Sequence, residues 1–509
     1  MRKTKRDQLL LETKPAPHRT SMNSRLLNEG AENSLPLVSF RDPSGQLIIT
    51  NDRVLRVVSD DSQATVRRFL DSPLKAALVA EQILIPTTEI MDGAVGSELR
   101  ELSFFETETP LVLEHEPIVF ASYPYEWPPE MLYAAGELTL NLMERVLVEG
   151  FGLKDATPYN VLFCGPKPIF VDFLSIEERD PLNPTWLAYA QFARTFIRPL
   201  LANKYFGLGL DQVFRVYRDG LQPDQVFRMC SLRQKFHPLF LSSVSLPALL
   251  SRMNPNRYEK IYRPRQSRSK EEAHFVLHRQ IKGLRRKLDA SKPNPGRSSA
   301  WSEYEESHQQ DKYLELKSTF VGTVLKQMEP ASVLDIGCNR GHFSLLAASF
   351  GCSVVSIDQD ATVVGGLWRE AFEKDLDILP LVIDITRPTA GLGWRNKETR
   401  GFLDRALGRF DCVFMLAIIH HMLVTERIPL PEILQLAWEL TTDRLIIEWI
   451  DAKEAMFHLL ARGNDHLYEY LTRDLFEKVS LKYFYLERRE MLNDGSRCLY
   501  EMRRRDQIA

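Results

Sequence analysis

Residues 333–344 read VLDIGCNRGHFS, and this stretch decides the predicted fold. Residues 331–336 form a short apolar run typical of a buried strand, which breaks into a glycine-flanked turn and continues into the helical pattern FSLLAASF. A strand, a loop and a helix in this order begin a doubly wound α/β unit. Because Gly337 and Gly341 carry no side chain, the backbone there can turn sharply and lie against a ligand. The pattern predicts a cofactor site on this loop.

The spacing within the loop indicates which cofactor it holds. A dinucleotide fingerprint reads G-x-G-x-x-G and places a pyrophosphate at a helix N-terminus, whereas this loop reads D-x-G-x-x-x-G from Asp335. The next apolar run, CSVVSID, ends at the acidic residue Asp358. This arrangement resembles motif I of class I S-adenosylmethionine (SAM) dependent methyltransferases. The resemblance implies that Asp335 orients the amino-acid tail of SAM and that Asp358 accepts hydrogen bonds from both ribose hydroxyls. It also implies cofactor contacts by the loop residues Gly337, Cys338, Asn339 and Gly341.

Length and composition limit the class of protein. A chain of 509 residues exceeds the size at which one hydrophobic core keeps growing, so two or three domains are expected. The net charge of −3 argues against a chain-wide nucleic-acid binder, and no nucleic-acid partner is expected. No apolar run approaches the roughly 20 residues that cross a bilayer, and no transmembrane segment is predicted. The six cysteines are scattered without a C-x-x-C pair or clustered histidines, so no metal site is predicted. Cysteines that stay as free thiols suit a reducing environment, so a cytoplasmic location is expected.

Composition shifts divide the chain into four segments. Residues 1–35 are polar and without periodicity, as in a disordered tail. Residues 36–254 alternate between strand and helix patterns and predict an α+β domain. Residues 255–300 form a basic linker that contains one helix, 271–288. The linker helix is either a solvated interdomain helix or a contact with an anionic membrane surface or polyanionic acceptor. Residues 301–509 form the domain that contains the glycine loop.

The segment 153–160, LKDATPYN, carries a second polar pattern. Asp155 and Asn160 stand five apart, and Asp172 follows a short strand in the string VDF. This pattern resembles the catalytic core of protein-kinase-like phosphotransferases, in which the first Asp is the base, the Asn holds magnesium and the later Asp bridges metal and phosphates. The chain departs from that family: Leu153 and Lys154 replace the preceding His-Arg, and no glycine-rich phosphate loop or V-A-I-K lysine is found upstream. Three interpretations stay open: an active kinase, a nucleotide- or acceptor-binding relic of that fold, and a coincidence.

Further candidate site residues follow the later strands of the second domain. The strand ILPLVID ends at Asp384, and in the methyltransferase resemblance Asp384 or the backbone of Ile385 reads the adenine amino group; alternatively, Asp384 caps the next turn. The strand predicted over 410–419 is followed by His420 and His421, at the carboxyl edge where open α/β sheets bind ligands. Either histidine is a candidate catalytic base, with cofactor contact or helix capping as the alternatives.

Two features lie at the edges of the second domain. The chain ends in a predicted hairpin around residues 493–495, and a terminal antiparallel hairpin is what class I methyltransferases add to the dinucleotide-binding order. Aromatic residues and Lys317 precede motif I, as in the leading helices that fold over SAM in many class I enzymes. Tyr304, Tyr313 and Lys317 are therefore candidates for the cofactor entrance, with plain helix packing as the alternative reading.

Several strings together resemble one bacterial family. YPYEW (123–127), LKDATPYN, FVDFLS (170–175) and WLAYAQF (186–192), followed by DIGCNRG, are similar to two-domain class I methyltransferases that include the NoeA-type nodulation proteins. The resemblance implies a cytoplasmic SAM-dependent methyltransferase that acts on a polysaccharide, a glycolipid or a related small molecule. It implies that the kinase-like N-terminal domain recognises the acceptor or regulates the enzyme. The alternatives are a bifunctional kinase-methyltransferase that modifies a glycan end and a non-catalytic SAM-binding regulator.

Overall fold

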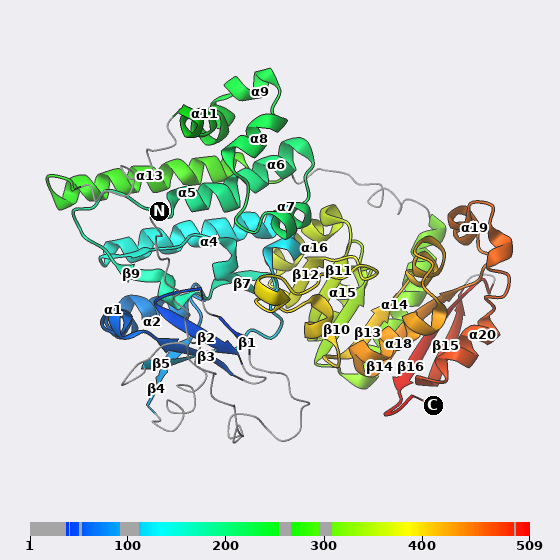
Figure 1. Ribbon diagram of the computed structural model, residues 1–509. Coiled ribbons are helices and arrows are strands. Elements are labelled where there is room, and N and C mark those ends of the chain that lie inside the picture. The colour runs from blue at the N-terminus through cyan, green and yellow to red at the C-terminus, as the bar shows by residue number, and fades with distance from the viewer. Residues whose placement is uncertain are drawn as a thin grey trace, which may run out of the picture.

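The computed structural model describes residues 37–39, 41–49, 53–91, 111–253, 266–294, 308–492 and 495–508. These residues form an N-terminal region and a C-terminal region, each built on its own sheet (Figure 1). The predicted tail 1–35, Tyr304 and the turn residues Asn493 and Asp494 lie outside the described residues. No helix among the described residues is long and apolar enough to cross a membrane.

The N-terminal region opens with an antiparallel sheet of five strands in the order β1-β2-β3-β5-β4. The strands are β1 (Leu37–Val38), β2 (Gly45–Ile49), β3 (Val54–Val58), β4 (Thr87–Ile90) and β5 (Leu111–His115). Helices α1 (Asp60–Leu70) and α2 (Pro73–Ala80) lie between β3 and β4 in the chain. Pro73 starts α2 because its fixed φ suits the first helical position.

A helical layer follows this sheet. It is centred on α4 (Pro129–Val148), which is preceded by the short 3-10 helix η1 (Pro124–Glu126). After α4, β6 (Phe151–Leu153) pairs with β9 (Ile176–Glu178), and the hairpin β7 (Val161–Cys164) and β8 (Lys167–Phe170) turns at Gly165. The 3-10 helices η2 (Pro158–Asn160) and η3 (Phe173–Ser175) flank this hairpin. The remaining helices are α5 (Tyr189–Phe192), η4 (Ala193–Ile197), α6 (Arg198–Phe206), α7 (Leu210–Val216), α8 (Pro223–Met229), α9 (Leu232–Phe236), α10 (Pro238–Phe240), η5 (Leu241–Ser245) and α11 (Leu246–Met253).

Helix α13 (Lys270–Ala290) corresponds to the helix expected in the basic linker. Its buried residues recur at helical spacing and form one apolar stripe: Ala273, Leu277, Ile281, Leu284 and Leu288. This stripe packs against α4, and Leu288 lies beside Gly136 of α4. The helix thus contributes to the packing of the N-terminal region, while its basic face remains exposed. The domain limits at 254 and 300 stay predictions.

The C-terminal region has the expected Rossmann-like fold. Its seven-stranded sheet has the order β12-β11-β10-β13-β14-β16-β15, and only pairings that involve β16 are antiparallel. The strands are β10 (Ser332–Ile336), β11 (Ser353–Asp358), β12 (Ile378–Val382), β13 (Phe410–Met415), β14 (Thr441–Ile450), β15 (Phe484–Leu492) and β16 (Arg497–Arg504). The antiparallel pair β15–β16 confirms the predicted terminal hairpin.

Helices and short turns connect these strands. They are α14 (His308–Met328), α15 (His342–Ser349), α16 (Ala361–Lys374), η7 (Trp394–Asn396), α17 (Phe402–Ala406), the π-helix η8 (His421–Thr425), α18 (Leu430–Leu440), α19 (Ala455–Ala461), η9 (Asp465–Leu467) and α20 (Arg473–Ser480). Strand β13 is shorter than the predicted 410–419, because Ala417 adopts a left-handed backbone conformation with φ 54°. Four residues therefore separate the end of β13 from His420.

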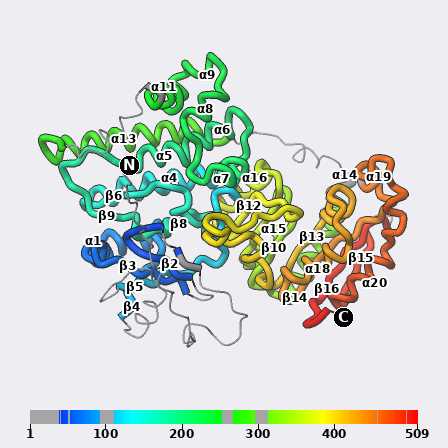
Figure 2. The backbone as a smooth tube through the Cα atoms, in the orientation of Figure 1, coloured from blue at the N-terminus to red at the C-terminus, as the bar shows by residue number. Residues whose placement is uncertain are grey.

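The two regions meet along α16, β12 and the segment that leads to α17 (Figure 2). Glu126, in the string YPYEW, is fully buried there and forms an ion pair with Arg405. Thr389 donates a hydrogen bond to the same carboxylate at 2.5 Å. The indole of Trp368 in α16 donates to the backbone carbonyl of Pro166 in the β7–β8 turn at 2.9 Å. The conspicuous aromatic string of the N-terminal region thus serves the contact between the regions.

Candidate active site

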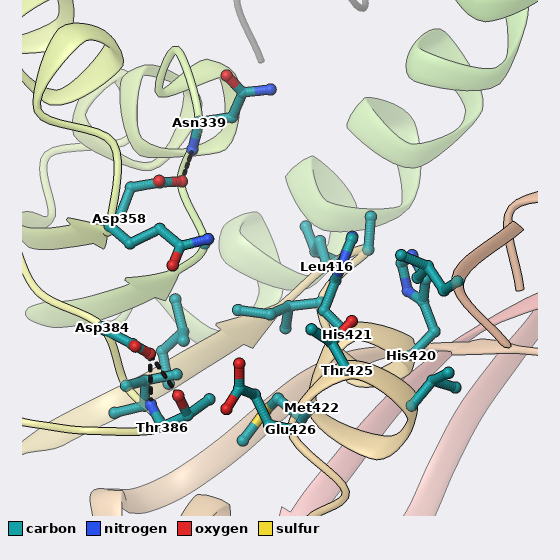
Figure 3. Close-up of a pocket in the computed structure, with 18 of the residues that line it drawn as sticks. Asn339, Asp358, Asp384, Thr386, Leu416, His420, His421, Met422, Thr425 and Glu426 are labelled. Atoms are coloured by element: carbon teal, nitrogen blue, oxygen red, sulfur yellow. Dashed lines mark hydrogen bonds between the residues drawn. The ribbon is translucent and has the colours of Figure 1, made fainter. Parts of the chain in front are cut away.

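A pocket of about 680 Å³ opens at the carboxyl edge of the parallel strands in the C-terminal region (Figure 3). This volume is in the range of small-molecule sites. The candidate residues that line it are Asp335, Gly337, Cys338, Asn339, Asp358, Asp384, Ile385, His420 and His421. Lys317 of α14 also lines the pocket. The structure therefore gathers side chains that are separated by up to about one hundred residues in the sequence.

The loop after β10 owes its shape to two glycines. Gly337 and Gly341 have φ values of 75° and 81°, in the left-handed region that a Cβ atom disfavours. A Cβ on Gly337 would lie 2.8 Å from Ile418, which lines the pocket, and one on Gly341 would lie 2.3 Å from the side chain of Leu367 in α16. Gly341 is not part of the pocket wall, so its role is to let α15 start close to α16. Gly337 lets the loop lie directly against Ile418.

Two carboxylates line the pocket after β10 and β11. Asp335 is 2% exposed, and its Oδ2 accepts a hydrogen bond from Ser344 at 2.6 Å. Burial raises the pKa of Asp335 to about 6, and no described cation forms an ion pair with it. Asp358 accepts hydrogen bonds from the backbone N–H groups of Asn339 and Asp360, at 3.0 and 2.9 Å. A buried carboxylate without a cation fits the ammonium group of SAM.

Asp384 fulfils one of the two alternatives that the sequence left open. Its Oδ1 accepts hydrogen bonds from the backbone and the hydroxyl of Thr386, so it caps the turn after β12 (Figure 3). Its other oxygen pairs with Arg387. The same residue, together with Ile385, lines the pocket. The carboxylate of Asp384 is therefore largely committed to the turn, and adenine contact by Asp384 or the backbone of Ile385 stays a prediction.

His420 and His421 line the pocket across from Asp358, at the start of η8 (Figure 3). Burial, together with the nearby His421, Arg497 and Lys317, lowers the pKa of His420 to about 2. Burial also lowers the pKa of His421. Nδ1 of His420 is buried without a hydrogen-bond partner among the described residues. Both rings are neutral at physiological pH, but a histidine with so low a pKa is a weak proton acceptor.

Behind the histidines lies an ionic cluster that the sequence pattern only hints at. Glu448 in β14 is fully buried and pairs with Lys317 at 2.5 Å and with Arg497 of β16 at 3.2 Å. Tyr313 donates a hydrogen bond to the same carboxylate. Burial lowers the pKa of Lys317; burial alone would raise the pKa of Glu448, but Lys317 and Arg497 hold it below its usual value. In the sequence, the local signal for this cluster is Glu448, a charged residue inside the apolar run RLIIEWI (444–450). No local pattern indicates Arg497.

The kinase-like candidates also come together, in the N-terminal region. Ser175 links Asn160 to Asp172: it accepts from the Asn160 amide at 3.0 Å and donates to Asp172 at 2.5 Å. Arg56 of β3 pairs with the other oxygen of Asp172 at 2.9 Å. Burial raises the pKa of Asp155, whose carboxylate accepts from Gln191 at 3.2 Å.

The chain's own residues occupy the space around this cluster. Lys154 reaches the β1–β2 turn and binds Asp42 and Ser44, each at 2.8 Å. A Cβ on Gly45 would lie 2.6 Å from Leu174, so the start of β2 lies directly against the segment after Asp172. One ion pair and one hydrogen bond from Lys154 thus tie the turn to the segment that carries Asp155.

The family described as methyltransferase domain matches residues 306–439 of this chain. The order of the seven strands, the terminal hairpin and the glycine loop after β10 agree with that match. The protein is a class I SAM-dependent methyltransferase, and SAM is its cofactor.

Over most of its length the chain is similar to the nodulation protein NoeA of Rhizobium meliloti (strain 1021): the two are 28% identical over 473 residues, which cover 92% of this chain and 95% of the relative. Among solved structures, the N-methyltransferase NodS from Bradyrhizobium japonicum WM9 matches with 12% identity and a TM-score of 0.28, over 39% of this chain and 99% of NodS. The magnesium protoporphyrin IX methyltransferase of Synechocystis PCC 6803 matches with 17% identity and a TM-score of 0.29, over 44% of this chain and 94% of the other.

Proposed function

We propose that this methyltransferase acts on a polysaccharide, a glycolipid or a related small-molecule acceptor. The observation that carries the proposal is the extent of the pocket, which continues from Asp358 and the glycine loop to the histidines and to residues of α19 and η9. One end suits SAM, which supplies a methyl group on a cationic sulfonium, and the other end leaves room for an acceptor. The acceptor class itself comes from the resemblance to NoeA-type nodulation proteins, one of which this chain matches over 92% of its length.

The candidate residues have separate roles in this proposal. Asp335 holds the ammonium group of SAM, Asp358 holds the ribose and the backbone at Ile385 contacts the adenine. The loop residues Gly337, Cys338 and Asn339 form the wall against the methionine part. The protein chiefly aligns the acceptor with the methyl group, since alignment alone supplies much of the rate enhancement of such a displacement. His420 and His421 lie where they can orient the acceptor by hydrogen bonds.

In the same proposal the N-terminal region recognises the acceptor or regulates the enzyme. Support comes from Glu126, which binds Thr389 and Arg405 of the C-terminal region. Thr389 stands three residues after Thr386, and Thr386 lines the pocket. Tyr125 also donates to Thr399 at 3.1 Å, further along the same segment. The N-terminal region therefore contacts the segment that follows Thr386, the lining residue next to the proposed adenine contact at Ile385.

Calorimetric titration of SAM into the full-length chain tests the proposed cofactor site. We expect the wild type to bind SAM and Asp358→Ala to bind it about 30- to 150-fold more weakly, because paired ribose hydrogen bonds worth about 2 to 3 kcal/mol are lost. Glu373→Ala is the matched control, since Glu373 is an exposed acidic residue of α16 outside the pocket. Absence of binding by the wild type, or equal affinity in Asp358→Ala, would contradict these cofactor assignments.

A second candidate function is phosphoryl transfer by the N-terminal region, favoured by the clustering of Asp155, Asn160 and Asp172. A magnesium ion at Asp172 would have to displace Arg56 and Ser175 from its two oxygens. If the cluster is active, magnesium-dependent ATP turnover should disappear in Asp172→Ala and persist in Asp71→Ala, a change at an exposed aspartate at the end of α1. Failure of the wild type to bind ATP would reject this function and leave the methyltransferase proposal intact.

A further inference from the structure

Several charged side chains that line the pocket form ion pairs. Lys317 and Arg497 both pair with Glu448. Arg387 forms ion pairs with both Asp384 and Glu426, which line the pocket at the end of β12 and at the end of η8. These pairs leave little net charge on this part of the wall.

Two lining arginines differ from this pattern. Arg427 follows η8, and Arg462 follows α19; both are exposed and line the pocket. Neither side chain has a hydrogen bond or an ion pair with any described residue. The two segments that carry them pack together, since α19 contacts η8 and Tyr468 donates to the carbonyl of Val424 at 3.3 Å. The pocket therefore carries, on adjoining segments of its wall, two positive charges that no described residue compensates.

Both arginines also have an unusual backbone. Arg427 has φ 56° and Arg462 has φ 49°, in the left-handed region that costs a residue with a Cβ about 1 kcal/mol or more. Glycine would fit each position at lower cost. Keeping a long cationic side chain at two strained positions of one pocket is consistent with a binding role for the charge.

We propose that the acceptor carries an anionic group, a phosphate or a carboxylate, which Arg427 and Arg462 bind; this rests on the proposed function and names its acceptor class. A guanidinium group matches both anions because it donates two parallel hydrogen bonds to two oxygens of one group. Two positive charges on adjoining segments also attract a ligand of the opposite sign.

The properties of the histidines support this acceptor class. Methyl transfer to a hydroxyl requires a base, and the lowered pKa values of His420 and His421 make them weak ones. An anionic oxygen needs no base. Its lone pair forms the new bond to the methyl carbon, the carbon–sulfur bond breaks, and its electron pair stays on sulfur. The products are a methyl ester and neutral S-adenosylhomocysteine, and no proton is transferred.

Binding of simple probes to the full-length chain tests the proposal without relying on turnover. The protein is first titrated with S-adenosylhomocysteine and, once saturated, with glucose 1-phosphate, glucuronic acid or glucose. We expect an anionic probe to bind and glucose to bind at least about tenfold more weakly. The stronger of the two anionic probes identifies phosphate or carboxylate as the group.

The double variant Arg427→Gln/Arg462→Gln is expected to bind the anionic probe about tenfold or more weakly than the wild type. Its affinity for S-adenosylhomocysteine should be unchanged, which also shows that the variant is folded. Arg395→Gln is the matched control, because Arg395 is an exposed arginine with φ 55° that does not line the pocket.

The outcomes separate this inference from the proposed function. If the wild type does not bind S-adenosylhomocysteine, the proposed function itself is wrong. If it binds S-adenosylhomocysteine but neither anionic probe, or binds glucose equally well, the anionic acceptor is rejected and the methyltransferase assignment stands. Unchanged binding of the anionic probe by the double variant also rejects the proposal.

Discussion

Replacing Glu448 with glutamine is expected to lower the free energy of unfolding by about 3 to 5 kcal/mol, because removing one member of a buried ion pair leaves the other charge buried without compensation. Lys317, only 4% exposed, would lose its ion-pair partner. Arg497 would keep its contact with Glu454 at 2.9 Å. Urea unfolding at equilibrium, followed by circular dichroism, measures the loss.

A double variant separates this charge effect from simple loss of packing. Glu448→Leu with Lys317→Met removes both charges, and we expect it to recover about 2 kcal/mol or more relative to Glu448→Gln, since apolar replacements of a buried pair are often neutral or stabilising. Glu370→Gln is the surface control: its i,i+4 pair with Lys374 is exposed and contributes about 0.5 kcal/mol at most. A loss below about 1 kcal/mol in Glu448→Gln would mean that Lys317 is not held as a buried cation.

This cluster also illustrates what the sequence could and could not predict. The strand, glycine loop and helix at 331–349 were predictable because period, turn residues and acidic strand ends are local signals. The partners of Glu448 were not, because Lys317 and Arg497 come from α14 and β16, far away in the chain, and only the folded sheet brings them together. The same holds for Glu126 and Arg405, whose contact depends on how the two regions pack.

Backbone conformation set a second limit. The apolar run 410–419 predicted one long strand, but Ala417 turns left-handed and β13 ends at Met415. A hydrophobic pattern indicates burial but not the φ angle, so the loop that carries His420 into the pocket could not be predicted from the sequence. The left-handed backbone conformations of Arg427 and Arg462 could not be predicted for the same reason. Nothing in the side-chain pattern distinguishes them from ordinary surface arginines.

The second large effect concerns Asp335: we expect SAM binding to release a proton in mildly acidic solution. In the free protein, burial raises the pKa of Asp335 to about 6, so this carboxyl group is mostly protonated at pH 5. A cationic ammonium group beside it favours the carboxylate and lowers its pKa in the complex. The affinity for SAM should therefore rise by about tenfold between pH 5 and pH 7 and level off above that range. Burial also raises the pKa of Asp358, which acts in the same direction.

Calorimetry at pH 5.0 in two buffers with different heats of ionisation counts the released proton directly. The pH dependence is expected to become much flatter in Asp335→Asn, because an amide cannot titrate, and the affinity of this variant at pH 7.5 should be lower than that of the wild type. Ser344→Ala offers an intermediate case. It removes the hydroxyl that donates to Asp335 at 2.6 Å and so should raise the pKa of the free carboxyl group and move the affinity change to higher pH. An affinity that does not change between pH 5 and pH 7 would place the ammonium group of SAM elsewhere in the pocket.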